Sequence, residues 1–88
     1  MKVSAIIVHP ADTVACLLYD HRAGESAVMP TGNVIVLLSD TPMGHKIALI
    51  AMARYTPVIK FGAVIGHAIV DISAGAHVHL QNLQGRLR

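Results

Sequence analysis

The apolar segments of this chain are short. The longest unbroken apolar run covers residues 47–53, whereas a helix that crosses a membrane needs about 18 or more such residues. The other apolar runs are rich in β-branched residues and are bounded by Gly, Pro, Asn or Asp. Runs of this length and composition are typical of β-strands. The pattern therefore predicts a mainly β domain and argues against a membrane protein.

Six segments carry the strand pattern most clearly. We expect strands at residues 3–8, 13–19, 33–39, 57–61, 65–70 and 77–80. Residues 47–54 are ambiguous, because their Ala, Met and Leu content also permits a helix of two turns. With 88 residues, the chain fits one domain that spans residues 1–88. Its last segment, residues 82–88, is either a C-terminal tail or a cut linker.

A weak internal repeat accompanies the strand pattern. Residues 18–28, 50–58 and 70–78 each read as a small turn that leads into a strand. Tyr55 stands where the last copy has Gly75, and tyrosine fits poorly if that position needs a positive φ. We therefore expect the turn at Tyr55 either to differ or to carry strain. The uneven spacing of the copies argues against a solenoid.

The chain is more apolar than a typical soluble domain. Apolar residues make up 53% of it before glycine is counted, whereas soluble domains reach about 45–50% with glycine included. A domain of this size has little interior in which to bury the excess. We therefore expect another protein chain to cover part of the surface.

Composition also bears on partners and compartment. The net charge is only +2, and two Tyr with one Phe are too few to form a stacking platform for nucleic acid. The apolar run after Lys2 ends too early, at His9, for a signal peptide. The single cysteine, Cys16, lies in an apolar run and reads as a buried, inert thiol. We expect a cytoplasmic protein that binds neither nucleic acid nor membrane.

Carboxylates are scarce, and no complete catalytic set can be read from the sequence. The five Asp and Glu residues form no close pair along the chain. Asp40 and Asp71 read as turn formers that bond their own backbone. The segment 62–66 lacks the lysine and hydroxyl of a phosphate-binding loop. Alone, the chain looks incomplete as an enzyme.

Histidine is abundant, with six residues in the chain. His77 and His79 are two apart in a predicted strand, so their side chains share one face. Two imidazoles could share a metal ion, but zinc needs three or four ligands and no further ligand is near in sequence. The alternative is an exposed polar strand face. We therefore assign no metal site to this chain.

His45 and Lys46 follow Pro42 and Gly44, which predict a turn after the strand at 33–39. Turns on a rigid scaffold often carry function, and histidine exchanges protons near neutral pH. Lys60 interrupts an apolar strand segment, where a lysine is unexpected unless it faces solvent or is paired.

These residues resemble the SAF domain of the altronate/galactarate dehydratase family. The resemblance runs from about residue 7 to residue 82. It is carried by residues 41–49 (TPMGHKIAL), 58–62 (VIKFG), Ile65-Gly66, Asp71-Ile72, Gly75, Val78-His79 and Asn82. Three positions depart from the family pattern. Phe61 stands where the family usually has tyrosine, Gln81 replaces a histidine, and the glycine expected near Tyr55 is absent.

The resemblance implies a compact β-clip fold with short helical turns. It also implies the small subunit, or N-terminal domain, of a metal-dependent hydroxy-acid lyase that is inactive without a larger catalytic subunit. Such an enzyme eliminates water or sulfite from a sugar-acid or sulfonate anion. A divalent metal, Fe2+ or Mg2+, would be held mainly by the larger partner, with none bound firmly by this chain. Homo-oligomerisation stays open.

The resemblance also suggests roles for individual residues. His45 would act as acid, base or hydrogen-bond donor. Lys46 and Lys60 would orient the anionic substrate, and His79 and Asn82 would complete the rim of the site. Two other interpretations stay open because of Phe61 and Gln81: a non-catalytic SAF module that binds a sugar acid or a partner protein, and a purely structural interaction domain.

Overall fold

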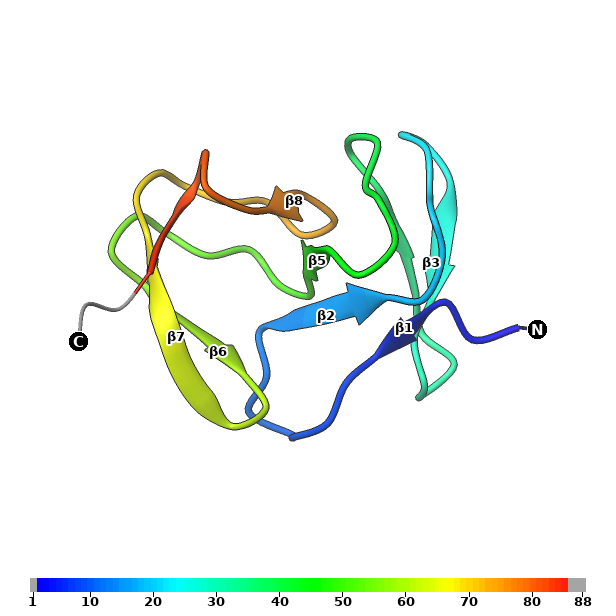
Figure 1. Cartoon of the computed structure of the whole chain (residues 1–88), viewed down its shortest axis with the longest axis horizontal. Helices are drawn as coiled ribbons and strands as arrows, with labels where there is room; N and C mark the ends of the chain where they lie inside the picture. Colours follow the sequence, from blue (N-terminus) through cyan, green and yellow to red (C-terminus); the bar gives the residue numbers. More distant parts are fainter. Residues whose placement is uncertain (1, 86–88) are drawn as a thin grey trace.

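The computed structural model describes residues 2–85, and every regular element within that range is a strand (Figure 1). The strands are β1 (Ala5–Ile6), β2 (Val14–Leu17), β3 (Ser26–Val28), β4 (Val34–Val36), β5 (Lys46–Ala48), β6 (Pro57–Lys60), β7 (Ala63–Ala68), β8 (His77–Val78) and β9 (Leu83–Gly85). The predicted mainly β fold is therefore confirmed.

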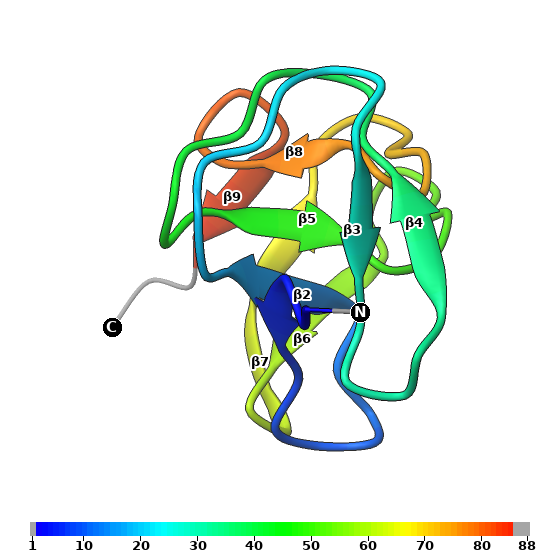
Figure 2. The same cartoon turned by 90° about the vertical axis from the view of Figure 1, so that its right-hand side faces the viewer.

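The strands form three small antiparallel sheets (Figures 1 and 2). The central sheet has the order β1-β2-β5-β8, β3 pairs with β4, and the third sheet has the order β6-β7-β9. In the central sheet Lys46 lies opposite Cys16 on one side and opposite Val78 on the other. Strand β5 thus joins the N-terminal half of the chain to β8.

Three of these strands, β3, β5 and β9, are not among the six expected from the sequence. Strand β5 includes the start of the ambiguous segment 47–54, and no helix forms there. Instead, Met52 bridges Ile72 and the backbone turns at Tyr55, so pairing with distant segments overrides the local helix propensity. The short helical turns that the family resemblance implied are likewise absent from residues 2–85. Within the segment 82–88, Leu83–Gly85 forms β9, and residues 86–88 lie outside the described part.

One turn recurs four times, at residues 20–25, 40–45, 51–56 and 71–76. Its fifth residue has a positive φ in each copy: 86° at Gly24, 82° at Gly44, 75° at Tyr55 and 86° at Gly75. The backbone hydrogen bonds also repeat. Gly44 donates to Leu17, for example, and Gly75 donates in the same way to Ala48. Tyr55 therefore adopts the turn of the other copies and carries the strain of a left-handed backbone.

The four turns associate in pairs. His21 forms a bridge with Thr41, and Met52 forms one with Ile72. Carboxylates reinforce these pairs from the first position of the turn. Asp40 accepts a hydrogen bond from the N–H of Ala23, and the N–H of Arg54 donates to Asp71. The prediction that Asp40 and Asp71 bond their own backbone is therefore wrong, because each carboxylate serves the partner turn.

The paired turns and the sheets enclose two apolar clusters. One contains Leu17, Met29, Leu37 and Ile47, and the other contains Val14, Ala48, Met52, Val58, Ile72 and Val78. The residue three positions after the positive-φ residue is apolar in every copy of the turn. These four residues, Ala27, Ile47, Val58 and Val78, have no exposed surface. Cys16 is half-buried rather than fully buried. No helix within residues 2–85 is long and apolar enough to cross a membrane.

Candidate functional site

The second copy of the turn places His45. Gly44 takes the positive φ at the turn, and the N–H of His45 then donates to the carbonyl of Pro42 at 3.1 Å. The carbonyl of His45 accepts a hydrogen bond of 2.9 Å from Leu17. His45 is thus held by backbone contacts on both sides, directly before β5 begins at Lys46.

Strand β8 and the turn after it place two more histidines. His77 lies opposite Ile47 in the β5–β8 pair, which brings it next to the turn that carries His45. The buried amide of Asn82 donates to the carbonyl of His77 at 2.8 Å and accepts from the N–H of His79 at 2.9 Å. Gln81 donates to the same carbonyl of His77 at 3.1 Å. Asn82 therefore fixes the backbone on either side of Val78.

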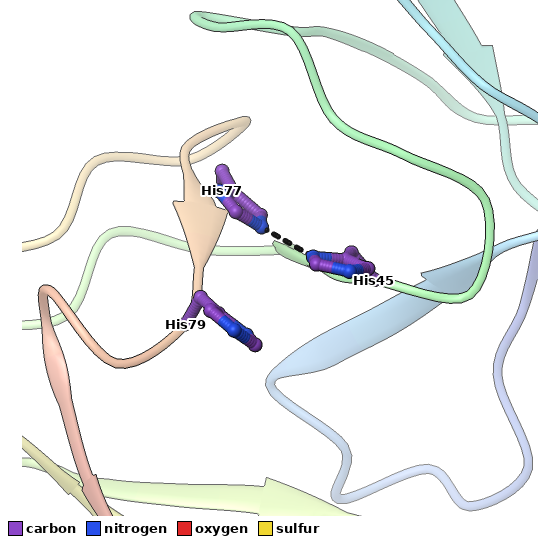
Figure 3. Close-up of side chains that lie close together, drawn as sticks. All are labelled: His45, His77 and His79. Atoms are coloured by element: carbon purple, nitrogen blue, oxygen red, sulfur yellow. Dashed lines mark hydrogen bonds between the residues drawn. The ribbon is translucent and has the colours of Figure 1, made fainter.

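The side chains of His45, His77 and His79 converge (Figure 3). Nδ1 of His45 lies 2.9 Å from Nε2 of His77. The ring centroids of the three pairs are 4.8 to 5.5 Å apart, and the rings are stacked at shallow angles. One ring nitrogen from each histidine lies within 4.8 Å of the other two, and all three residues are half-buried. We call this group the histidine cluster.

The surroundings of the histidine cluster disfavour a positive charge on His77. Burial lowers the pKa of His77 most, and the nearby charges of His45, His79 and Lys46 lower it further. The 2.9 Å contact between Nδ1 of His45 and Nε2 of His77 requires one nitrogen to donate and the other to accept, so both rings cannot be imidazolium. His77 therefore favours the neutral imidazole, the form that ligates metals and accepts protons.

Of the two predicted lysines, Lys46 lies beside the histidine cluster and Lys60 does not. Lys46 follows His45 directly, is half-buried, and adds its positive charge to the surroundings of His77. Lys60 ends β6 and stands 4.8 Å above the ring of Phe61. The β6–β7 turn lies beside the β1–β2 connection in both views, away from β5 and β8 (Figures 1 and 2). Lys46 could therefore act together with the histidine cluster, whereas Lys60 lies in a different part of the fold.

From the sequence, His77 and His79 were expected to share one strand face, and the family resemblance placed His45 and His79 in one site, but the contact between His45 and His77 was not predicted. The connection depends on the register between β5 and β8, which local patterns do not reveal. One signal was present in the sequence. Asp20, Asp40 and Asp71 each precede a glycine by four residues, and this spacing marks the turn at residues 40–45 as a copy of the turn at 71–76. Both turns lead into neighbouring strands of one sheet.

Known proteins are similar in sequence to this chain. Residues 3–86 match the family described as the altronate/galactarate dehydratase SAF domain. The altronate dehydratase of Escherichia coli K12 is 40% identical over 82 residues, which cover 93% of this chain and 16% of that protein. The altronate dehydratase of Bacillus subtilis is 38% identical over 84 residues, covering 96% of this chain and 17% of that protein.

A separate subunit is also among the relatives. The (2R)-sulfolactate sulfo-lyase subunit alpha of Paracoccus pantotrophus is 43% identical over 44 residues, which cover 50% of this chain and 66% of that subunit. The chain spans about one-sixth of the length of the two altronate dehydratases. On the match over residues 3–86, the chain belongs to the family of altronate/galactarate dehydratase SAF domains.

Proposed function

We propose that this chain is a component of a hydroxy-acid lyase, as its small subunit or N-terminal domain, and that it supplies basic residues to a site completed by a larger protein. The observation that carries the proposal is the histidine cluster with Lys46 beside it. The relatives add support, since they are dehydratases about six times as long as this chain or a subunit of a sulfo-lyase.

The proposed reaction explains why such residues are needed. A proton next to a carboxylate leaves only when the negative charge that develops is stabilised. The leaving group at the β-carbon then needs a proton donor. His45 would transfer that proton or donate a hydrogen bond, since its imidazole lies in a half-buried position open to a ligand. Lys46 would attract the substrate carboxylate, and His79 would line the rim.

Two further residues belong to the proposal. Lys60 would reach the substrate only where the larger protein brings the anion to the β6–β7 turn. Asn82 would contribute to the rim mainly by positioning, since its amide already bonds the backbone of His77 and His79.

The family resemblance implies a divalent metal, and the residues of this chain discriminate between the two ions expected. Imidazole nitrogens suit iron and other transition metals, whereas Mg2+ prefers oxygen ligands. The histidine cluster offers three imidazoles and no carboxylate, so it fits Fe2+ and does not fit Mg2+. When bound, such an ion supplies a positive charge that stabilises the developing carboxylate charge.

Exposed apolar side chains give the proposed partner a surface to cover. Val34, Val36 and Leu38 alternate along β4 and beyond it, and their exposed fractions are 47%, 54% and 56%. Residues two apart in a strand share one face, so Val34 and Val36 lie on the same face of β4, and Leu38 follows in the bend after the strand. We call these three exposed residues the apolar strip. Burial of that strip against the larger protein would account for the apolar excess of the chain.

The alternative is a non-catalytic SAF module, and two observations favour it. Gln81 stands where the family resemblance expects a histidine and bonds the carbonyl of His77 instead. Phe61, which lacks the hydroxyl of the expected tyrosine, is 54% exposed and packs against Lys60. Such a module would bind a sugar acid without any larger protein.

Capture of the tagged full chain from its native organism tests the proposal, with mass spectrometry of stoichiometric partners. We expect one larger protein that restores elimination from a sugar-acid or sulfonate anion when it is mixed with the chain. Recovery of the chain alone, together with saturable binding of a sugar acid to the isolated chain, would support the non-catalytic module and exclude the lyase.

A further inference from the structure

We propose that His45, His77 and His79 form a binding site for one first-row transition-metal ion within this chain itself. This departs from the expectation that the metal is held mainly by the larger partner. It deepens the proposed function and depends on it for the identity of the substrate, but the binding of the ion can be measured without any lyase.

The nitrogen positions are close to those of a metal site. Two ligands on a tetrahedral zinc ion, each about 2.0–2.1 Å from it, lie roughly 3.3 Å from each other. Nδ1 of His45 and Nε2 of His77 are 2.9 Å apart, and the nitrogen of His79 is within 4.8 Å of both. Small rotations of the half-buried rings would therefore bring all three nitrogens to one ion.

The backbone around the cluster is built to hold the rings in place. His45 is fixed by hydrogen bonds to Pro42 and Leu17. His77 is paired within the central sheet, and the amide of Asn82 holds the N–H of His79. A site whose backbone is set before the ion arrives loses little conformational entropy on binding. The three ligands come from two distant segments, so the folded chain assembles them.

The donor set indicates both the kind of ion and the kind of site. Three imidazoles suit zinc, iron, nickel or copper. Three protein ligands leave one coordination position open, which is typical of catalytic rather than structural zinc sites. Lys46 adds a positive charge beside the cluster. The open position would therefore receive an anionic oxygen ligand, and in the proposed lyase that ligand is a carboxylate or hydroxyl oxygen of the substrate.

Metal binding is compatible with a role for His45 in hydrogen bonding. An imidazole has two ring nitrogens, and only one of them ligates an ion. The other nitrogen of His45 keeps its proton when the first is bound. His45 would then hold the ion and still donate a hydrogen bond to the substrate or to the larger protein.

Titration of the metal-free full chain with Co2+ and Zn2+ tests the site directly. The absorption bands of Co2+ report a low-coordinate site with nitrogen ligands, and calorimetry with Zn2+ reports stoichiometry and affinity. We expect one ion per chain, and a rise in Tm with Zn2+ that a chelator reverses. The variants His45→Ala, His77→Ala and His79→Ala should each weaken Zn2+ binding at least tenfold.

His67→Ala is the matched control, because His67 is an exposed histidine on β7 outside the cluster. It should bind Zn2+ as the unmodified chain does. The absence of saturable binding would overturn the metal site, and so would binding that survives in His77→Ala and His79→Ala. Circular dichroism of each variant confirms that it folds. If the chain binds no ion but restores lyase activity with its partner, the metal site is wrong and the proposed function still holds.

Discussion

Asp20 and Asp40 occupy the same position in two paired turns, and each carboxylate bonds the backbone of the other turn. Oδ1 of Asp20 accepts from the N–H of Met43 at 2.8 Å, and Oδ1 of Asp40 accepts from the N–H of Ala23, also at 2.8 Å. The pair is therefore reciprocal. In the second pair Asp71 bonds the N–H of Arg54, but the position equivalent to its partner is occupied by Ala51, which has no carboxylate.

Removing one of the reciprocal carboxylates should loosen the first pair of turns. We expect Asp40→Ala to lower the free energy of unfolding by about 1 kcal/mol, because a charge-assisted hydrogen bond at an exposed site is lost. Urea denaturation of the full chain measures the change. Ser39→Ala is a suitable control, since Ser39 is the exposed neighbouring residue. Equal stability of the Asp40→Ala and Ser39→Ala variants would show that the cross-turn bond contributes nothing.

Adding the missing carboxylate should strengthen the second pair. In Ala51→Asp the new side chain would reach the N–H of Ala74, the equivalent of Arg54 in the other turn. We expect a gain of about 0.5–1 kcal/mol in the free energy of unfolding. Ala53→Asp introduces the same charge at an exposed position two residues away and should give no gain. A gain of equal size in both variants would point to net charge instead of the turn.

Glycines in equivalent turns should respond differently to alanine. Gly24 and Gly75 both have a φ of 86°, but a Cβ at Gly24 meets nothing within 4 Å, whereas a Cβ at Gly75 would lie 2.2 Å from the carbonyl oxygen of Val36. Gly24→Ala should therefore cost about 1 kcal/mol for the left-handed backbone alone. Gly75→Ala should cost about 3 kcal/mol or more, because β4 must shift. Denaturation of the two variants, side by side, compares these costs, and equal losses would contradict the close approach to Val36.

Acid should weaken the contact between the β1–β2 connection and the β6–β7 turn. Burial raises the pKa of Asp12, but hydrogen bonds from four backbone N–H groups outweigh burial and lower it, and these come from Gly62, His9, Phe61 and Val8. Because the pKa of Asp12 is lower in the folded chain, the unfolded chain binds more protons at acidic pH. The stabilisation by ionised Asp12 is therefore present above about pH 4 and is lost as the pH falls through the pKa of Asp12 in the folded chain.

The variant Asp12→Asn tests this pH dependence. It should be less stable than the unmodified chain at pH 7, and the difference between the two should shrink as the pH falls below about 4. Urea denaturation at a series of pH values measures the difference. A difference that stays constant down to pH 3 would show that the ionised form of Asp12 is not what stabilises the fold.

Much of the fold follows from local sequence patterns, and the site does not. Short β-branched runs predict the strands, and Gly24, Gly44 and Gly75 predict turns because they tolerate a positive φ. Strand β5 escapes prediction because it is three residues long and borders a segment with helix-forming residues. Its pairing with β2 and β8 decides its structure. The same non-local register brings His45 next to His77. The sequence therefore identifies the residue types of the site, but it does not show that these two histidines are in contact.

The turnover of a complex that contains His45→Ala tests the central claim most directly. The larger protein would be mixed with the unmodified chain, with His45→Ala or with His67→Ala, and elimination from the hydroxy-acid anion would be followed together with the affinity of each complex. We expect His45→Ala to bind the larger protein normally and to lower kcat about 100-fold or more, while His67→Ala keeps full activity. Full turnover by the His45→Ala complex would contradict a catalytic role for the histidine cluster.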